Sequence, residues 1–248
     1  MSIAMFPRRR FLALGAWCLL PWRVRAEDAA PPAMRFSSLA PGAALPEWLA
    51  PITFGGRVKT NDAAFVADEG RTVLRFRSQG SSSGFARAMR VDPAAFPMLT
   101  WQWKTARLLA KGGLGSKEAD DFPVRLYVTF DLDPSTLSLG DRLRLGAARA
   151  IWGAHLPSAA LCYVWDGQAQ VETVANNAYT DRVRMIVVQS GAARLGHWVT
   201  HERNVAEDYR RAFGAAPPAV SSLIVSADTD NTGESTESWF GDVAFRAR

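Results

Sequence analysis

The chain of 248 residues has little cysteine, little histidine and no long apolar run. Its two cysteines are Cys18, close to the N-terminus, and Cys162, which stands alone in the rest of the chain. Removal of an N-terminal segment would therefore leave no partner for an internal disulfide, and burial of apolar surface has to stabilise the fold. The apolar run from Phe11 to Trp22 is too short to span a hydrocarbon core, which needs about 20 residues. We expect neither a disulfide framework nor a transmembrane segment.

The N-terminus has the order of a secretory signal peptide. Arg8, Arg9 and Arg10 precede the apolar run, and Val24-Arg25-Ala26 provides small residues at a cleavage point. The letters Arg-Arg-Arg-Phe-Leu also fit the twin-arginine pattern, so the general secretory route and export of the folded protein both stay open. We expect residues 1–26 to be removed and the remaining chain to be periplasmic.

The excess of positive charge in the chain lies in residues 1–26. The whole sequence carries 29 Lys and Arg against 24 Asp and Glu. Residues 1–26 contain five arginines and no acid, which leaves 24 bases against 24 acids in the processed chain. A domain of zero formal net charge lacks the field that drives non-specific binding to phosphates. No nucleic-acid partner is expected.

Alternation of apolar and polar residues dominates the processed chain and predicts strands. Within Pro123–Asp131, for example, every second residue from Val124 to Phe130 is apolar, while Arg125, Tyr127 and Thr129 share the other face. The nine predicted strands are Arg71–Arg77, Phe85–Val91, Leu99–Thr105, Pro123–Asp131, Ala160–Trp165, Asp181–Gln189, His197–Arg203, Ser221–Asp228 and Ser238–Arg246.

Two helices are expected among the strands. A capping-box spacing at Ser138 predicts a helix that runs to Gly153. Asn204, with Glu207 three residues later, predicts a second helix that ends before Gly214. Many strands with so few helices do not form an alternating β-α-β pattern. The expected fold is therefore an all-β-dominated sandwich, jelly-roll-like or galactose-binding-like, with two inserted helices.

No linker or internal repeat divides the chain beyond its start. Residues 1–26 are expected to form the signal peptide and residues 27–46 an Ala/Pro-rich leader, in which 34–39 could form a strand. Residues 47–248 are expected to form a single β-sandwich domain.

The segment from Asp228 to Gly233 has the most specific local pattern. Oxygen-bearing side chains alternate along it and glycine stands at the sixth position, as in the opening of a calcium loop. A site for Ca²⁺ or another hard cation is one interpretation, and an Asp/Asn/Gly turn that satisfies its own backbone is the other. The candidate metal ligands are Asp228, Asp230, Asn231 and Asp242.

Aromatic residues supply candidates for ligand binding. Pairs of them share one face of a predicted strand, where they could stack on the apolar faces of sugar rings while polar side chains bind the hydroxyls. The alternative for each ring is a place in the core of the sandwich. The candidate ligand-binding residues are Trp101, Trp103, Tyr163 and Trp165 for stacking, with Arg125 and Tyr127 for the hydroxyls.

Two adjacent carboxylates, Asp120 and Asp121, precede the strand that carries Arg125. Neighbouring side chains on an extended chain point to opposite sides, so a cap or an ion pair is favoured over joint acid–base work. If the protein is an enzyme, Asp120 or Asp121 together with Asp228 and Asp230 are the candidate carboxylates.

Five segments of the chain carry a family resemblance. They are Trp101-Gln102-Trp103-Lys104, Asp120-Asp121-Phe122 through Phe130, Cys162-Tyr163-Val164-Trp165, Asn177 through Ser190, and Asp228-Thr229-Asp230-Asn231-Thr232 through Gly241-Asp242. Over roughly residues 35–248 the chain resembles the bacterial family called domain of unknown function 3047. This resemblance implies an exported single-domain protein and assigns no catalytic residue. The ending is also similar to carbohydrate-binding jelly rolls with a structural calcium site, a likeness of fold from which function does not follow.

Three hypotheses about function result. The first is an exported β-sandwich that binds a ligand, with a glycan as the expected partner. The second is an enzyme that acts on envelope or polymeric carbohydrate through its aspartates. The third is an envelope scaffold that binds another protein.

Overall fold

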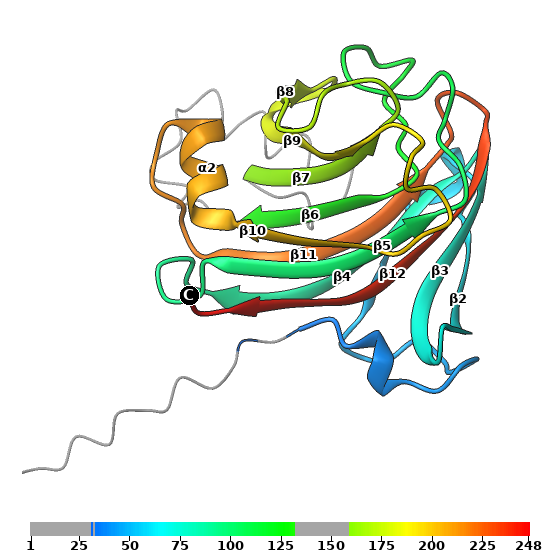
Figure 1. The fold of residues 1–248 in the computed structure, drawn as a ribbon, viewed down its shortest axis with the longest axis horizontal. Coiled ribbons are helices and arrows are strands. Elements are labelled where there is room, and N and C mark those ends of the chain that lie inside the picture. Colours follow the sequence, from blue (N-terminus) through cyan, green and yellow to red (C-terminus); the bar gives the residue numbers. More distant parts are fainter. Residues whose placement is uncertain (1–30, 32, 132–158) are drawn as a thin grey trace, which may run out of the picture.

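The computed structural model describes residue 31 and residues 33–131 and 159–248. Their strands form two sheets that stack into a jelly-roll-like β-sandwich, which confirms the mostly-β class (Figure 1). The seven-stranded sheet has the order β1 (Ala50–Ile52), β4 (Ser82–Val91), β11 (Val220–Asp228), β6 (Arg125–Phe130), β7 (Ala159–Asp166), β9 (Thr180–Ser190) and β8 (Val174–Asn177). The five-stranded sheet has the order β10 (Val199–Asn204), β5 (Met98–Thr105), β12 (Ser235–Arg246), β3 (Arg71–Gln79) and β2 (Asp62–Asp68).

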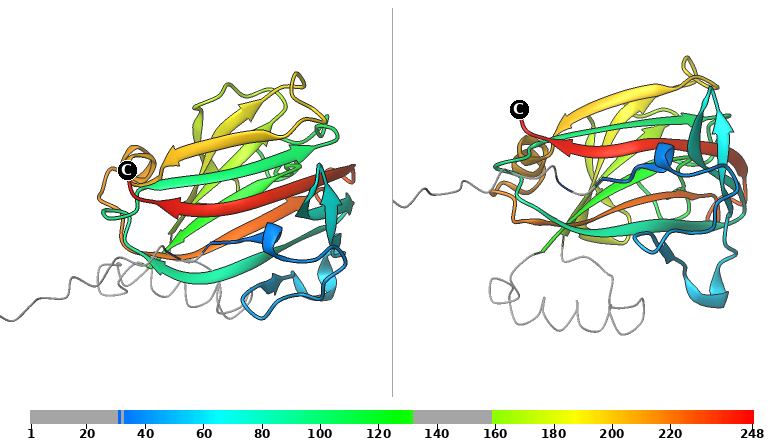
Figure 2. Two further views of the ribbon diagram at one scale, coloured as in Figure 1. Left: turned by 60° about the horizontal axis from the view of Figure 1, so that its bottom comes forward. Right: turned by 90° about the horizontal axis from the view of Figure 1, so that it is seen from below.

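The chain changes sheet repeatedly, so that β4, β6 and β11 lie in one layer and β5, β10 and β12 in the other. The right-hand view of Figure 2 separates the layers, with β12 in red and β11 in orange on different levels. Neighbouring strands pair antiparallel, except that β7 and β9 run parallel. All nine strands predicted from the sequence are present, and β1, β2 and β8 are additional.

The described residues contain one α-helix, α2 (Val205–Phe213), and two short 3₁₀ turns, η1 (Phe36–Ser38) and η2 (Gly55–Arg57). The predicted cap of α2 is confirmed, since the side chain of Asn204 accepts a hydrogen bond of 3.1 Å from the backbone N–H of Glu207. Gly214 ends the helix in the left-handed conformation at φ 71°. The helix predicted over 138–153 lies outside the described residues. None of the helices in the described ranges is long and apolar enough to cross a membrane.

The core fills the space between the two sheets with the inward-facing residues of both. It extends further toward the N-terminus than the sequence suggested. Met34 pairs with Val243 of β12, and both Met34 and Phe36 are fully buried in the same core. The 34–39 segment forms this bridge and η1, and its packing places part of the predicted 27–46 leader inside the sandwich.

The outer face of the seven-stranded sheet carries a second, smaller apolar cluster. Alternation along β6 and β7 turns Tyr127, Cys162 and Val164 away from the main core, and Phe122 from the preceding loop packs over them. This face positions the polar site described next.

Candidate functional site

Arg125, at the start of β6, is the centre of a buried polar cluster, and only 3 % of its side chain is exposed. Its Nε donates to Oδ1 of Asp228 at 2.9 Å, and its Nη2 lies 2.5 Å from Oδ2 of the same carboxylate. Nη1 donates to Oδ1 of Asp120 at 3.3 Å and approaches the hydroxyl of Tyr127 at 3.4 Å. A single buried guanidinium is therefore shared by two carboxylates, an arrangement in which each charge depends on the others.

Strand register brings these residues together. Ser226 of β11 pairs with Arg125 of β6, so Asp228, two positions further along β11, lies on the same face of the sheet. Oδ1 of Asp228 also accepts the backbone N–H of Phe122 at 2.9 Å, which fixes the loop that leads into β6. Asp228 thus connects the end of β11 to the start of β6.

Asp120 and Asp121 point to different partners, as their adjacency on an extended chain predicts. Asp120 binds Arg125 and accepts a hydrogen bond of 3.1 Å from the amide of Asn177. Asp121 is almost completely buried and accepts the backbone N–H groups of Asn231 at 3.3 Å and Thr232 at 2.6 Å. Asp121 therefore holds the turn that follows β11.

Three carboxylates of this region meet. Asp121, Asp228 and Asp230 each offer an oxygen, and the three oxygens lie within 4.8 Å of one another. Oxygen ligands of this kind are those that hard cations such as Ca²⁺ take. Of the four predicted ligands, Asp228 and Asp230 belong to this group, and Asp121 was not predicted.

Asp242, the fourth predicted ligand, is not a member of this group of carboxylates. Its carboxylate accepts the backbone N–H of Ser37 at 2.9 Å and the Ser37 hydroxyl at 2.6 Å, so it caps η1. Nδ2 of Asn231 donates to the carbonyl of Lys117 at 2.6 Å and to the hydroxyl of Tyr179 at 2.9 Å.

Burial sets the protonation of the cluster. It raises the pKa of Asp228 to about 7, against the opposing influence of the Arg125 guanidinium. Partial burial and the neighbouring charge of Asp121 raise the pKa of Asp230. Burial also raises the pKa of the Cys162 thiol to about 12, so this cysteine stays protonated and fits a structural role.

Tyr179, Asp230 and Asn231 form the solvent-exposed edge of the cluster, called the rim below. The aromatic ring of Tyr179 is exposed there, with 57 % of its surface accessible. Asn231 holds its hydroxyl, and the side chain of Asn177 accepts its backbone N–H at 3.0 Å. Nζ of Lys117 lies 5.2 Å from the centre of the ring. The side chain of Asn231 is exposed, as is that of Asp230, which precedes it in the chain. Sequence reasoning missed Tyr179 because its exposure follows from the β8–β9 turn, and β8 itself was not predicted.

The predicted stacking residues lie elsewhere. Trp101, Trp103, Tyr163 and Trp165 are at most 1 % exposed and form part of the core between the sheets. Trp101 packs on Tyr163 with ring centres 5.0 Å apart, and the hydroxyl of Tyr163 donates to Asp208 of α2 at 2.8 Å. Protein atoms cover the faces of these rings, so the structure does not present them for stacking on a sugar. Of the predicted binding residues, Arg125 and Tyr127 do lie in the cluster.

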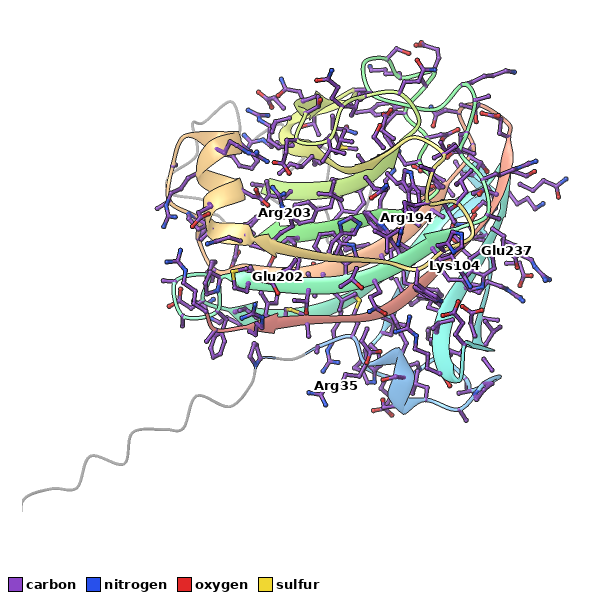
Figure 3. The ribbon with its side chains drawn as sticks, in the orientation of Figure 1. Arg35, Lys104, Arg194, Glu202, Arg203 and Glu237 are labelled. Atoms are coloured by element: carbon purple, nitrogen blue, oxygen red, sulfur yellow. The ribbon has the colours of Figure 1, made fainter. Side chains whose placement is uncertain are left out.

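A separate network of charges closes the side of the sandwich near α2. Arg203 of β10 binds both Glu172, which precedes β8, and Asp208 of α2. Hydrogen bonds from Arg203 are the main cause that lowers the pKa of Glu172 to about 2. Figure 3 shows Arg203 and Glu202 on β10 beside α2, and Lys104 with Glu237 at the far end of the five-stranded sheet. A cavity of about 330 Å³ next to this network is lined by Glu202, Arg203, Asn204, Glu207, Asp208 and Arg211.

Together these features define a two-sheet β-sandwich that carries a buried arginine–carboxylate centre on the outer face of one sheet. The chain belongs to the family described as "Protein of unknown function (DUF3047)", whose model matches residues 46–244, and the resemblance noted in the sequence is confirmed. No curated protein matches the sequence significantly. Among solved structures, a native family 12 xyloglucanase from Bacillus licheniformis has a TM-score of 0.45 and 4 % identity, over 88 % of this chain and 100 % of that chain. A likeness of this degree assigns no function.

Proposed function

We propose that the protein binds a glycan at the rim of the Arg125 cluster. The observation that supports this proposal is the exposed ring of Tyr179, held by side-chain hydrogen bonds beside Asp230 and Asn231. Sugar rings have apolar faces that stack on aromatic side chains, and their hydroxyls bind carboxylates and amides. The rim offers both kinds of partner at one place.

The ring of Tyr179 is fixed before any ligand arrives. Asn231 binds its hydroxyl, Asn177 binds its backbone, and Asn177 is itself tied to Asp120 of the cluster. Binding then costs less side-chain entropy than it would with a free aromatic side chain. The buried cluster thus acts as the support of the rim, while the ligand contacts are made by Tyr179, Asp230 and Asn231.

Binding of residues 27–248 to a panel of immobilised soluble polysaccharides, measured by biolayer interferometry, tests the proposal. We expect selective binding to at least one polymer and about tenfold weaker binding by Tyr179→Ala, equivalent to about 1.4 kcal/mol. The matched control is Leu45→Ala, which removes an exposed apolar side chain from the segment between η1 and β1. Binding by Tyr179→Ala that equals the wild type would overturn the proposal, provided that circular dichroism shows both variants folded.

A second candidate function, cleavage of the bound glycan, is favoured by the raised pKa values of Asp228 and Asp230. A carboxyl group whose pKa is raised is a better proton donor to a leaving glycosidic oxygen, while a second carboxylate activates water. Asp230 is the exposed member of the three carboxylates and is the better placed acid. Release of reducing ends from the bound polymer, lost in Asp230→Asn, would support this function. Tight binding of the polymer without release of reducing ends would support a binding protein and contradict cleavage.

Export to the periplasm is part of the same proposal and rests on the N-terminal residues alone. Recovery of a periplasmic protein that begins at Glu27, compared with a variant in which Arg8, Arg9 and Arg10 are replaced by Gln, tests it. A cytoplasmic protein that retains residues 1–26 would contradict it.

A further inference from the structure

We infer that the rim site selects uncharged glycans and excludes polyuronates and sulfated glycans. This inference rests on the proposed glycan binding and names the class of ligand. It follows from how the charges around Tyr179 are already used.

The first step is that Arg125 is not available to a ligand. Acidic sugars are usually bound by a guanidinium that offers two parallel N–H groups to the carboxylate or sulfate. Here Nε and Nη2 both face Asp228, Nη1 faces Asp120 and Tyr127, and Nη2 also donates to the carbonyl of Asp120. All donor groups of Arg125 are turned toward protein acceptors, and only 3 % of the side chain is exposed.

The second step is the balance of the remaining charges. Asp120 and Asp228 together outweigh Arg125 by one negative charge when both are ionised. Asp121 and Asp230 add two more carboxylates, and their oxygens lie within 4.8 Å of Asp228. Lys117, whose Nζ lies 5.2 Å from the centre of the Tyr179 ring, offsets one of these charges.

The third step is where a ligand would lie. A sugar stacked on Tyr179 lies next to Asn231, which binds the Tyr179 hydroxyl, and Asp230, the preceding residue of the chain, has an exposed side chain. The carboxylate of Asp230 accepts hydrogen bonds from hydroxyls, whereas it repels a carboxylate or sulfate on the same sugar.

The test compares neutral and acidic polymers of related backbone by biolayer interferometry with residues 27–248. The probes are hydroxyethyl cellulose against carboxymethyl cellulose, galactan against polygalacturonate, and neutral galactomannan against alginate. We expect binding that depends on Tyr179 to at least one neutral polymer, and at least tenfold weaker binding to its acidic counterpart. Asp230→Asn should reduce the difference in affinity between the neutral and the acidic polymer severalfold, by improving binding to the acidic polymer.

The matched control is Glu202→Gln, which removes one exposed carboxylate from β10 of the other sheet (Figure 3). It should leave the difference in affinity between neutral and acidic polymers unchanged. Because it changes the net charge by the same amount as Asp230→Asn, it separates an effect of net charge from an effect at the rim. Raising the salt concentration should reduce this difference in the wild type, because screening weakens repulsion between exposed charges.

The outcomes separate the inference from the proposal on which it rests. Binding to acidic polymers that depends on Tyr179 and equals or exceeds binding to neutral polymers overturns the inference and leaves glycan binding standing. Binding that is indifferent to Tyr179 for every polymer overturns both. An equal response of Asp230→Asn and Glu202→Gln would show that discrimination comes from net charge, and this also overturns the inference.

Discussion

Asp228 binds the guanidinium of Arg125 from a position 103 residues further along the chain, with 2.9 Å between Nε and Oδ1. The pair joins the last residue of β11 to the first residue of β6 on the outer face of the seven-stranded sheet. Since Asp120 approaches the same guanidinium, removal of Arg125 would leave two buried carboxylates facing each other.

Replacement of Arg125 by Met is therefore expected to lower the free energy of unfolding by about 3–5 kcal/mol at pH 7. The loss should be smaller at pH 4, because protonation of Asp228, whose pKa burial raises to about 7, then removes one of the unpaired charges. Urea denaturation at the two pH values measures both effects. The matched control is Arg77→Met, whose partners Glu237 and Asp62 lie at the surface and for which a loss below about 1 kcal/mol is expected. Equal losses for the two variants would contradict the structural role of Arg125.

His201 provides a prediction about pH. It lies on β10 with its ring centre 5.1 Å from that of Trp101 and 5.0 Å from that of Trp103, and its Nε2 is buried without a hydrogen-bond partner among the described residues. Burial, aided by the charge of Arg203, lowers the pKa of His201 to about 4. The unfolded chain therefore binds the proton first as the pH falls from about 6.5, and stability present above pH 6.5 is lost toward pH 4.

The expected loss attributable to His201 is about 3 kcal/mol over this range. It should be absent in His201→Phe, whose ring fits between the two tryptophans without a titrating group. His197, which is exposed and precedes β10, is the control, and His197→Phe should keep the wild-type dependence on pH. Parallel stability curves for His201→Phe and the wild type between pH 7 and 4 would show that the histidine does not titrate as described.

The core position of Trp103 leads to a prediction that separates packing from ligand binding. Trp103→Ala should lower the free energy of unfolding by about 3–5 kcal/mol, because it leaves a large cavity between the sheets. Trp103→Phe keeps a ring in place and should remain folded at room temperature. Its binding to polysaccharide is expected to equal that of the wild type. Lost binding by a folded Trp103→Phe variant would restore the original hypothesis that this face contacts the ligand.

Asp242 is expected to act through Ser37 and not through a cation. Asp242→Ala removes two hydrogen bonds to Ser37 and should lower the free energy of unfolding by about 1–2 kcal/mol. Hydrogen exchange around η1, which holds Phe36 in the core, should increase. The effect should be the same with calcium and with chelator. A loss that appears only in the presence of calcium would support Asp242 as a metal ligand.

Much of the fold was predictable because alternation along a strand records burial directly. The segment from Val124 to Phe130 shows this, since its apolar residues face the core and Arg125 and Tyr127 face outward, as predicted. β2 and β8 were missed for a physical reason. β2 has three alanines and two aspartates around Phe65 and Val66, and the four residues of β8 include one β-branched residue, Val174, before two asparagines, so both are poor in the β-branched and aromatic residues that mark strands.

The site was only partly predictable, because its members come from distant segments. The motif from Asp228 to Gly233 pointed to the right turn, and Asp121 and Arg125 were noted as residues near a strand. Nothing in the sequence places Asp121 against a turn 110 residues away, since that contact depends on how the sheets stack. The same limit explains why the burial of the aromatic residues was not predicted. Trp101 and Trp103 share a face, but only the second sheet decides whether that face is covered.

The position of β12 has a consequence for the order of synthesis. This strand follows all the others in the chain, yet it is the middle strand of the five-stranded sheet and pairs with β3 on one side and β5 on the other. A nascent chain that has not yet released residues 235–246 from the ribosome leaves both of those strand edges open and lacks the packing of Phe240 on Trp103 of β5. The unpaired N–H and C=O groups of these open strand edges can pair with other chains, so the incomplete chain is prone to aggregation. The five-stranded sheet is therefore complete only after translation has passed its last strand.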